Sequence, residues 1–353
     1  MKVLYSPLDW GIGHASRSIW YIHRLLGEGH EVVLAADGAA LVLLRTVFPA
    51  LSFERLPFCR IRYSRFLPAV WKIFFSLPCL MRGVRREHRR LLMLTEGQGY
   101  DLIISDHRYG VWHPQIRSEL VIHQLWIRLP GYLRFLEPLL FRIHRKMLKP
   151  FDRIIVPDEA GEPNYAGLLS HPRHLPDGLR QKMEYRGIAS RFLIAEYCRE
   201  VPLNRIYDVV VVLSGPEPQR SVLERLLLRR LRGREWQVLV IRGLPWKKQG
   251  ATVGGNIRLV SHLPPELFCA YLKRARYIIA RAGYSSVMDL VALGRGAMLI
   301  PTPGQTEQEY LAEHLSEREG FVMMTQKEIR EEGRKFEARC AMLEARRGKG
   351  GKG

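Results

Sequence analysis

The sequence predicts an α/β protein with two domains, each built on a doubly wound and mostly parallel sheet. Short apolar runs of strand length recur along the chain, each followed by a small-residue or polar turn and a helical segment, which is typical of parallel βα units. The series begins at residue 2 and begins again at Tyr207–Leu213, after a crossing segment at Tyr185–Phe192. The length of 353 residues also favours two domains over one.

The net charge of the chain favours some classes of binding partner over others. The formal net charge is +20, which favours an anionic partner such as nucleic acid, acidic lipid or a phosphorylated substrate. Between Pro57 and Pro150 there are 17 Lys and Arg residues and 6 Asp and Glu residues, a net charge of +11. More than half of the excess charge therefore lies in this segment. No apolar run reaches the ~18 residues that would span a bilayer.

The cysteines predict a reducing compartment. They are scattered, odd in number and form no CxxC pair, which argues against a disulfide framework and against a zinc site. The N-terminus is typical of a strand and a loop, not of a signal peptide. We therefore expect a cytoplasmic protein. The five cysteines are Cys59, Cys79, Cys198, Cys269 and Cys340.

The loop Pro7–Ala15, after the first strand, carries Gly11, Gly13 and His14. It lacks the third glycine of the dinucleotide fingerprint and the Gly-Lys-Ser/Thr of a P-loop. A histidine at the carboxyl edge of a sheet can act as a general base because its pKa lies near the working pH. Arg17 could face the same cleft and hold a phosphate. The alternative is that His14 caps or packs the helix that follows.

Two further polar residues follow predicted strands of the first domain. Asp106 comes after the strand Asp101–Ser105, and His123 comes after the apolar stretch Leu120–Ile122. Asp106 is a candidate base, or a partner that orients His14; the alternative is a helix cap. His123 is expected to line the same cleft.

Two basic amphipathic segments, Phe66–Thr95 and Leu129–Lys149, place apolar bulk beside arginines and lysines. This pattern is typical of helices that lie in a membrane interface. Pro68 and Pro78 are expected to break the first segment into two short helices. The alternatives are core-packed helices with a solvated basic face and, more weakly, a nucleic-acid surface, since no nucleic-acid-binding module is visible.

A turn of small residues follows the predicted strand Tyr277–Ala280 and opens a helix. The free N–H groups of such a helix N-terminus suit a phosphate, and the turn adds Gly283 and the hydroxyls of Ser285 and Ser286. Asp289, one turn into the helix, could accept two hydrogen bonds from a ribose diol, so its removal is expected to weaken donor binding and spare the fold. The alternative is a Gly-Ser cap with a structural acid.

The next βα unit begins with the predicted strand Ala297–Pro301. A polar loop that contains Gln305 leads to a helix from about Gln308, and Gln308 and Glu309 are expected to face a sugar. Gly294, between the two units, is placed as the C′ glycine of the preceding helix.

The run RAGYSSVMDL…PTPGQTEQEY resembles the C-terminal donor-binding segment of glycosyltransferase family 28. That family has an Arg-Ser-Gly-type turn, an acidic residue in the first helical turn, a proline loop and a Gln-Gln pair. The matching places here hold Arg281–Gly283, Asp289, Pro301–Gln305 and Gln308-Glu309. Asp replaces the family's Glu at 289, and Glu replaces a Gln at 309. The loop GxGHxxR resembles both the acceptor loop of this family and the loop of a UDP-sugar hydrolase family.

The resemblance implies the GT-B architecture, two Rossmann-like domains facing a cleft. Residues 1–188 would form the acceptor-side domain with the two basic amphipathic segments, and residues 189–325 would form the nucleotide-sugar-binding domain. Residues 326–353 would form a C-terminal helix and a basic tail. In two-domain transferases such a helix often returns to the first domain. Further donor contacts would come from the ends of other strands. They are Ser214, Gly215, Arg242, His262 and Leu263.

The implied activity is transfer of a hexosyl group from a nucleotide-diphosphate sugar, with a UDP-sugar as the expected donor, to an acceptor hydroxyl with inversion. His14 or Asp106 would be the base. The acceptor would be lipid-linked or amphiphilic, at an anionic membrane surface on the inner face of the cell membrane. No cofactor is expected, and no metal, because no Asp-x-Asp pair ends a strand. The alternatives are a nucleotide-sugar hydrolase or epimerase, and a non-catalytic protein that binds membrane or nucleic acid.

Overall fold

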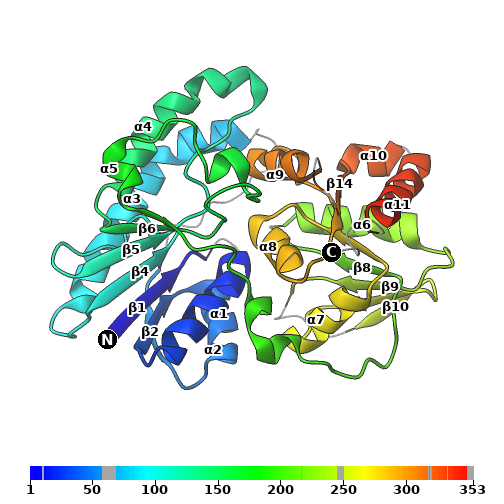
Figure 1. Cartoon of the computed structure of the whole chain (residues 1–353), viewed down its shortest axis with the longest axis horizontal. Coiled ribbons are helices and arrows are strands. Elements are labelled where there is room, and N and C mark those ends of the chain that lie inside the picture. Colours follow the sequence, from blue (N-terminus) through cyan, green and yellow to red (C-terminus); the bar gives the residue numbers. More distant parts are fainter. Residues whose placement is uncertain are drawn as a thin grey trace. The chain divides into compact units, whose positions relative to one another are not determined.

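The computed structural model describes residues 1–9, 12–57, 69–215, 217–244, 250–316, 318, 320–331 and 333–347. The chain divides into two compact units, Met1–Ala189 and Ser190–Gly353, each with its own sheet (Figure 1). This division lies one residue beyond the domain boundary expected from the sequence. Both units are α/β, as predicted.

The N-terminal unit contains a parallel sheet of seven strands in the order β3-β2-β1-β4-β5-β6-β7. The order reverses between β1 and β4, and in doubly wound sheets such a reversal marks the place where ligands bind. The register there pairs Val3 with Leu102 and Pro7 with Asp106. The strands are β1 (Lys2–Pro7), β2 (Glu31–Ala36), β3 (Ser52–Arg55), β4 (Leu102–Asp106), β5 (Arg117–Val121), β6 (Arg153–Val156) and β7 (Met183–Tyr185).

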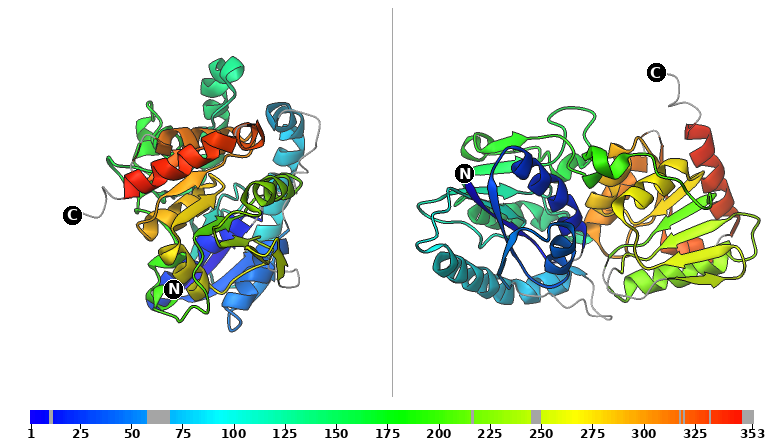
Figure 2. Two further views of the ribbon diagram at one scale, coloured as in Figure 1. Left: turned by 90° about the vertical axis from the view of Figure 1, so that its right-hand side faces the viewer. Right: turned by 90° about the horizontal axis from the view of Figure 1, so that it is seen from below.

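Helices cover both faces of this sheet, as the two views of Figure 2 show. They form because apolar residues recur at helical spacing and turn one stripe of side chains toward the strands. The helices are α1 (Ile12–Gly27), α2 (Gly38–Val47), α3 (Ala69–Thr95), α4 (Glu137–Leu148) and α5 (Asp177–Arg180), with the 3-10 turns η1 (Gly131–Leu136) and η2 (Gly167–Leu169).

The first basic segment forms one long helix, so the expected break at Pro78 is wrong. Helix α3 runs through Pro78 over 27 residues. A proline inside a helix removes one hydrogen bond and costs about 3 kcal/mol, but the rest of this helix keeps its bonds and buries Glu87 and Leu91. The part of the segment around Pro68 lies outside the described residues.

A buried arginine holds the loop after β4 in place. Arg108 donates from Nε to Glu87 Oε1 at 2.6 Å and from Nη2 to the Leu56 carbonyl at 2.7 Å. The Gly110 N–H donates to Glu87 Oε2 at 3.0 Å. Burial raises the pKa of Glu87, and the Arg108 charge opposes that rise. The network anchors this loop to α3 and β3, and thereby positions Asp106 at its start.

Helix α4 packs its inner face into the unit through Phe141, His144 and Leu148. The His144 imidazole is fully engaged. Its Nδ1 lies 3.0 Å from the Leu125 carbonyl, to which it donates, and its Nε2 accepts from the Tyr109 hydroxyl at 2.8 Å. Burial lowers the pKa of His144 to about 4.

This buried histidine predicts acid sensitivity of the N-terminal unit. The unfolded chain takes up the proton near pH 6.5, whereas the folded pKa of His144 is about 4, so stability is lost as the pH falls through this interval. The loss through His144 should be about 2 kcal/mol between pH 6.5 and pH 5. Urea unfolding at both pH values should show this loss in the wild type and a correspondingly smaller one in His144→Gln. An equal loss in both proteins would contradict the assignment.

The C-terminal unit contains a second sheet, in the order β10-β11-β9-β8-β12-β13-β14. All neighbouring pairs are parallel except β10 with β11. The order again reverses beside the first strand of the unit, between β8 and β12. The strands are β8 (Val209–Val212), β9 (Val238–Ile241), β10 (Ala251–Val253), β11 (Ile257–Val260), β12 (Tyr277–Ala280), β13 (Ala297–Leu299) and β14 (Phe321–Met323).

The helices of this unit also lie on both sides of its sheet (Figure 2). The unit begins with the short turns η3 and η4. Gly294, with φ of 62°, follows the C-cap residue Leu293 of α8, as expected for a C′ glycine. The helical elements are η3 (Arg191–Leu193), η4 (Ala195–Cys198), α6 (Gln219–Leu231), α7 (Pro265–Arg274), α8 (Tyr284–Ala292), α9 (Thr306–Ser316), α10 (Gln326–Glu331) and α11 (Gly333–Arg347).

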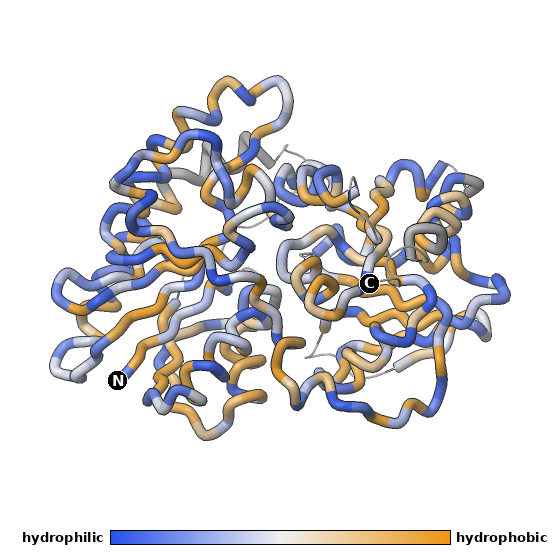
Figure 3. The backbone as a smooth tube through the Cα atoms, viewed as in Figure 1, coloured by the Kyte–Doolittle hydropathy of each residue, from blue (hydrophilic) through white to orange (hydrophobic). Residues whose placement is uncertain are grey.

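One core joins the sheet to α6, α10 and α11. Alternate strand residues such as Val209 and Val211 face it, together with Leu227 of α6, Ile329 of α10 and Phe336 of α11. The residues of these strands are largely hydrophobic, as the colouring by hydropathy in Figure 3 shows. Residues 326–347 therefore pack within the C-terminal unit. The predicted tail, residues 348–353, lies outside the described residues.

A membrane span was not expected from the sequence. Among the described residues, no helix combines the length and the apolar character needed to cross a membrane.

Candidate functional site

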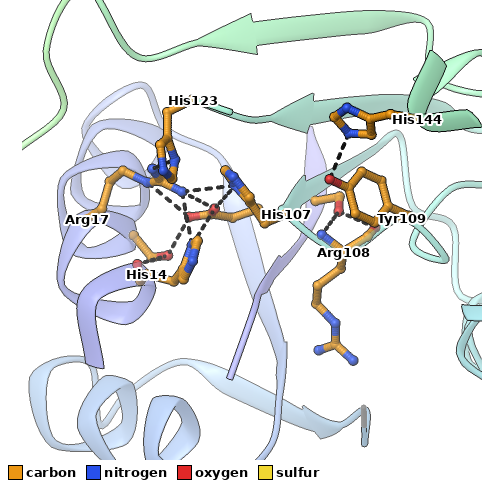
Figure 4. Close-up of polar contacts among 10 residues, drawn as sticks. His14, Arg17, His107, Arg108, Tyr109, His123 and His144 are labelled. Carbon is orange, nitrogen blue, oxygen red and sulfur yellow. Dashed lines mark hydrogen bonds and ion pairs between the residues drawn. The ribbon is translucent and has the colours of Figure 1, made fainter. Parts of the chain in front are cut away.

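A polar cluster lies at the carboxyl edge of the N-terminal sheet, where the strand order reverses. His14 lies in the first turn of α1, Asp106 ends β4, His107 follows it, and His123 lies just beyond β5. Figure 4 shows His14, His107 and His123 converging with Arg17 of α1. The structure thus brings together four residues predicted for this edge. Gly13 lies in the same turn as His14, whereas Gly11 lies outside the described residues.

Asp106 is the centre of this cluster. Its fully buried carboxylate lies 3.1 Å from His14 Nδ1 and 3.3 Å from His107 Nδ1. Arg17 donates to both carboxylate oxygens, from Nε to Oδ2 at 3.3 Å and from Nη2 to Oδ1. Burial alone would raise the pKa of Asp106, but the charges of Arg17 and His14 outweigh burial and hold it well below the ordinary value. Asp106 is therefore ionised.

Arg17 has a different role from the one expected. Its side chain is fully buried and forms an ion pair with Asp106, and its Nη1 lies 3.1 Å from His123 Nδ1. A guanidinium committed to a buried carboxylate gains little from leaving it for a phosphate. The structure therefore assigns Arg17 to holding Asp106 and His123, and the phosphate role is a correction to the sequence interpretation.

His107 is a member of the cluster that the sequence did not single out. Its backbone adopts φ of 59°, which is unusual for a non-glycine residue. Its buried Nε2 atom has no hydrogen-bond partner within the described residues. The pKa of His107 is lowered mainly by burial and next by the neighbouring His123, and the pKa of His123 is lowered mainly by burial and next by Arg17. The sequence signal that could have identified His107 is its position directly after Asp106 at a strand end.

Three potential metal ligands lie within this cluster. One ligand atom from each of His14, Asp106 and His107 falls within 4.8 Å of the others. Arg17 Nη2 lies 3.1 Å from His14 Nδ1 and 3.4 Å from His107 Nδ1, and it also bonds to Asp106. The guanidinium thus occupies the place that a metal cation would take, and a metal would have to displace it.

The N-terminus of α8 forms the candidate phosphate site of the C-terminal unit. Gly283 is its N-cap, and Ser285 and Ser286 lie half-buried in its first turn. A Cβ atom at Gly283 would approach only Gln308 Nε2, at 4.0 Å, so the protein's own packing does not require glycine there. The neighbouring Arg281 is structural: it is buried and donates to the carbonyls of Pro301 and Gln219, at 3.1 and 2.8 Å.

Gln308 and Glu309 shape the loop after β13. The Thr302 N–H donates to Gln308 Oε1 at 2.9 Å, and the Gly304 N–H donates to Glu309 Oε1 at 2.8 Å. Gln308 and Glu309, the residues predicted to face the sugar, therefore each use a side-chain oxygen to hold this loop. Gln305 Oε1, which can accept a hydrogen bond from a ligand, and Thr302 Oγ1, which can accept or donate one, are buried without a partner within the described ranges.

Asp289 lies in the second turn of α8, not the first, and it has protein partners. Ser190 Oγ donates to it at 2.6 Å, and Arg191 Nη2 donates to it at 3.2 Å. Burial raises the pKa of Asp289, while the charge of Arg191 opposes that rise. Asp289 thus has two protein partners from the segment that enters the unit, and its contact with a ribose diol stays a prediction.

The other residues predicted to bind the nucleotide-sugar are Ser214, Gly215, Arg242, His262 and Leu263, and they differ in how free they are to meet a ligand. Ser214 and Gly215 follow β8, beside β12, and Gly215 has φ of 95°. His262 follows β11. Its pKa is lowered mainly by its burial and to a smaller extent by the nearby charge of Arg191. Arg242 instead binds Glu224 of α6 at 3.0 Å, so it is not a free phosphate ligand. Leu263 is buried and lines a pocket with Tyr271 and Arg258.

The Asp289 contacts predict a structural cost that the sequence did not indicate. Asp289→Ala would leave the largely buried Arg191 without its carboxylate, and breaking such a pair costs roughly 3 kcal/mol. Urea unfolding should show this loss, with a smaller one in Asp289→Asn, which keeps an acceptor for Ser190. Wild-type stability in Asp289→Ala would contradict the role.

Comparison with known proteins gives two kinds of similarity. Residues 220–336 match a model of the Glycosyltransferase family 28 C-terminal domain. An uncharacterized glycosyltransferase of Methanosarcina acetivorans is 24% identical over 337 residues, which cover 92% of this chain and 85% of that protein. The UDP-N-acetylglucosamine--N-acetylmuramyl-(pentapeptide) pyrophosphoryl-undecaprenol N-acetylglucosamine transferase of Bacillus licheniformis is 27% identical over 132 residues, 34% of this chain and 35% of that enzyme.

Solved structures show the same fold. The spinosyn rhamnosyltransferase SpnG matches with a TM-score of 0.64 at 14% identity, over 99% of this chain and 95% of SpnG. Its complex with thymidine diphosphate matches with a TM-score of 0.62. The predicted fold class and the prediction of an enzyme are thus confirmed. The chain is a glycosyltransferase with the GT-B fold, and residues 220–336 of its C-terminal unit are similar to the family 28 C-terminal domain.

Proposed function

We propose that this glycosyltransferase transfers a hexosyl group from a UDP-sugar to an acceptor hydroxyl, with inversion at the anomeric carbon. The observation that carries the proposal is the placement of His14 against the buried, ionised Asp106 at the carboxyl edge of the N-terminal sheet. A histidine held by a buried carboxylate is a general base that can take a proton from a hydroxyl.

The proposed mechanism uses the tautomer of His14 in which Nδ1 carries the proton and donates a hydrogen bond to the ionised Asp106, 3.1 Å away, so that Nε2 keeps the lone pair. Arg17 Nη2, which can only donate, lies at the same distance from Nδ1, and in this tautomer it donates to Asp106 instead. The acceptor hydroxyl gives its proton to Nε2 as its oxygen attacks the anomeric carbon. Asp106 then stabilises the imidazolium, and Arg17 keeps Asp106 charged and in position.

The donor side of the proposal rests on the C-terminal unit. The N–H groups at the start of α8 and the hydroxyls of Ser285 and Ser286 suit a diphosphate, and their partial charges would stabilise the leaving nucleoside diphosphate. The thymidine diphosphate complex of SpnG and the UDP-sugar donor named for the Bacillus relative support a nucleoside diphosphate. Gln305 Oε1, which has no hydrogen-bond partner among the described residues, is a candidate acceptor for a hydroxyl of the sugar donor in the adjoining loop.

The acceptor side of the proposal rests on the outer face of η1 and α4. Tyr132, Phe135 and Leu139 are 62%, 74% and 52% exposed. Exposed basic residues continue along the same helix: Arg142, Arg145, Lys146 and Lys149. Large exposed apolar side chains beside cations suit an anionic membrane surface, and the acceptor named for the Bacillus relative carries an undecaprenol lipid. We therefore propose a lipid-linked acceptor and peripheral attachment to the cytoplasmic face of the membrane.

This surface predicts selective vesicle binding. The protein should sediment with vesicles of phosphatidylglycerol and not with vesicles of phosphatidylcholine, because each Lys or Arg near an anionic surface contributes about 1 kcal/mol. Phe135→Ser should weaken binding roughly tenfold through lost apolar burial. Ile206→Ser, at a residue of the C-terminal unit that is 64% exposed, is the matched control and should bind as the wild type does. Equal binding to both vesicles would reject the surface.

Release of free nucleotide tests the function. The protein is incubated with a panel of UDP-sugars and other nucleotide-sugars, with and without a membrane lipid extract, and nucleoside diphosphate is quantified. Release that requires the extract would support transfer to a lipid-borne acceptor and would identify the donor. Release without the extract would favour the hydrolase or epimerase alternative that GxGHxxR suggests. The same turnover in excess chelator is expected, because Arg17 takes the cation's place beside Asp106.

A further inference from the structure

Two cysteines of the C-terminal unit lie side by side although they are far apart in the sequence. Cys198 ends η4 and Cys269 lies on α7, 71 residues later, with their Sγ atoms 2.7 Å apart. Cys198 is half-exposed and Cys269 is buried. A disulfide bond is about 2.05 Å long, so a small movement of either side chain would bring the sulfur atoms to bonding distance.

The surroundings distinguish the two thiols. Lys273, one turn after Cys269, donates from Nζ to the Cys198 carbonyl at 3.3 Å, so a cation lies beside the pair. Burial, and then the bond to Cys198, raise the pKa of Cys269 to about 12. Cys269 therefore stays a thiol at neutral pH, and the half-exposed Cys198 is the sulfur that a dissolved oxidant reaches first.

We propose that Cys198 and Cys269 form a site of reversible oxidation, at which a low-molecular-weight disulfide converts the two thiols into an intramolecular disulfide. The Cys198 thiolate attacks the small disulfide and displaces one thiolate, which takes up a proton. Cys269 then loses its proton, attacks the Cys198 sulfur and displaces the second small thiol. In total, two protein thiols are oxidised and one small disulfide is reduced to two thiols.

The bond would fasten the segment through which the chain enters the C-terminal unit. Residues 195–198 of η4 would be tied to α7, and the preceding residues Ser190 and Arg191 bind Asp289 on α8. Closing a loop of this length restricts the unfolded chain and so stabilises the folded unit. This inference goes beyond the proposed function, since it assigns a modification and not a step of transfer.

Mass spectrometry on the full chain tests the proposal. After incubation with oxidised glutathione, the intact mass should fall by two hydrogen atoms, and a digest without reductant should contain the Cys198 and Cys269 peptides joined. The melting temperature should rise by on the order of 5 to 10 °C, and dithiothreitol should reverse all three changes. Glutathione that stays attached to Cys198 with no joined peptides would overturn the proposal.

Three variants keep the test decisive. Cys198→Ser should abolish the joined peptides and the rise in melting temperature. Cys269→Ser should instead leave a stable glutathione adduct on Cys198, because the resolving thiol is gone. Cys79→Ser, which removes an exposed cysteine outside the pair, is the matched control and should behave as the wild type does. Loss of the cross-link in Cys79→Ser would contradict the assignment.

Discussion

His14→Ala should lower kcat by about 10²- to 10⁴-fold, the usual contribution of a general base, while the dissociation constant for the nucleoside diphosphate stays within about twofold. The reason is that His14 belongs to the N-terminal unit, whereas the proposed diphosphate site lies at α8 of the C-terminal unit. Steady-state kinetics with the donor identified by nucleotide release give kcat, and calorimetric titration with the nucleotide gives the affinity.

His30→Ala is the matched control for this result. His30 lies in the same unit, its side chain is 17% exposed against 19% for His14, and its Nε2 lies 3.5 Å from the Glu28 carboxylate. It precedes β2 and so lies away from the carboxyl edge of the sheet. Its variant should keep wild-type kcat. Equal losses in the two variants, or an unchanged kcat in His14→Ala, would reject His14 as the base.

Asp106→Asn should lower both activity and stability. The variant removes the carboxylate that orients His14, which in histidine–carboxylate pairs costs up to about 10⁴-fold in kcat. It also leaves the fully buried Arg17 without its counter-charge, which costs roughly 3 to 5 kcal/mol. The folded pKa of Asp106 is depressed, so its stabilisation is present above pH 4 and is lost as the pH falls through that folded value. Urea unfolding at neutral and acid pH measures this loss.

A double variant separates the two effects of Asp106. Arg17→Met combined with Asp106→Leu removes both buried charges and should recover part of the stability that Asp106→Asn loses. It should recover no activity, because His14 still lacks its carboxylate. Stability no better than that of Asp106→Asn would contradict the ion-pair account, and recovered turnover would contradict the role of Asp106 in catalysis.

Elements set by local pattern could be predicted from the sequence. The strand Tyr277–Ala280 has the predicted bounds, because four consecutive apolar residues between polar turns suit a strand buried on both faces. Gly294 ends α8 for a reason that is local to its own backbone angle. The approach of His14 to Asp106 also follows from the fold, since the carboxyl ends of parallel strands meet at one edge of a sheet.

Contacts between distant segments could not be predicted. Asp289 meets Ser190, 99 residues earlier, and no local pattern in α8 shows that its carboxylate is already bound. Cys198 and Cys269 looked like scattered cysteines because 71 residues separate them. Helix α3 passes through Pro78 since its packing, which sequence periodicity does not measure, outweighs one lost hydrogen bond. Arg17 looked like a free phosphate ligand for the same reason: its partner, Asp106, comes from another strand.

The anomeric configuration of the product tests most directly the claim that a base beside the acceptor drives a single displacement. The donor identified by nucleotide release, carrying an α-linked sugar, is supplied with its acceptor, and the product is examined by proton NMR before any later rearrangement. Direct attack by a hydroxyl that His14 deprotonates predicts a β-linked product. An α-linked product would mean retention of configuration, and it would contradict both the single displacement and the role of His14 as its base.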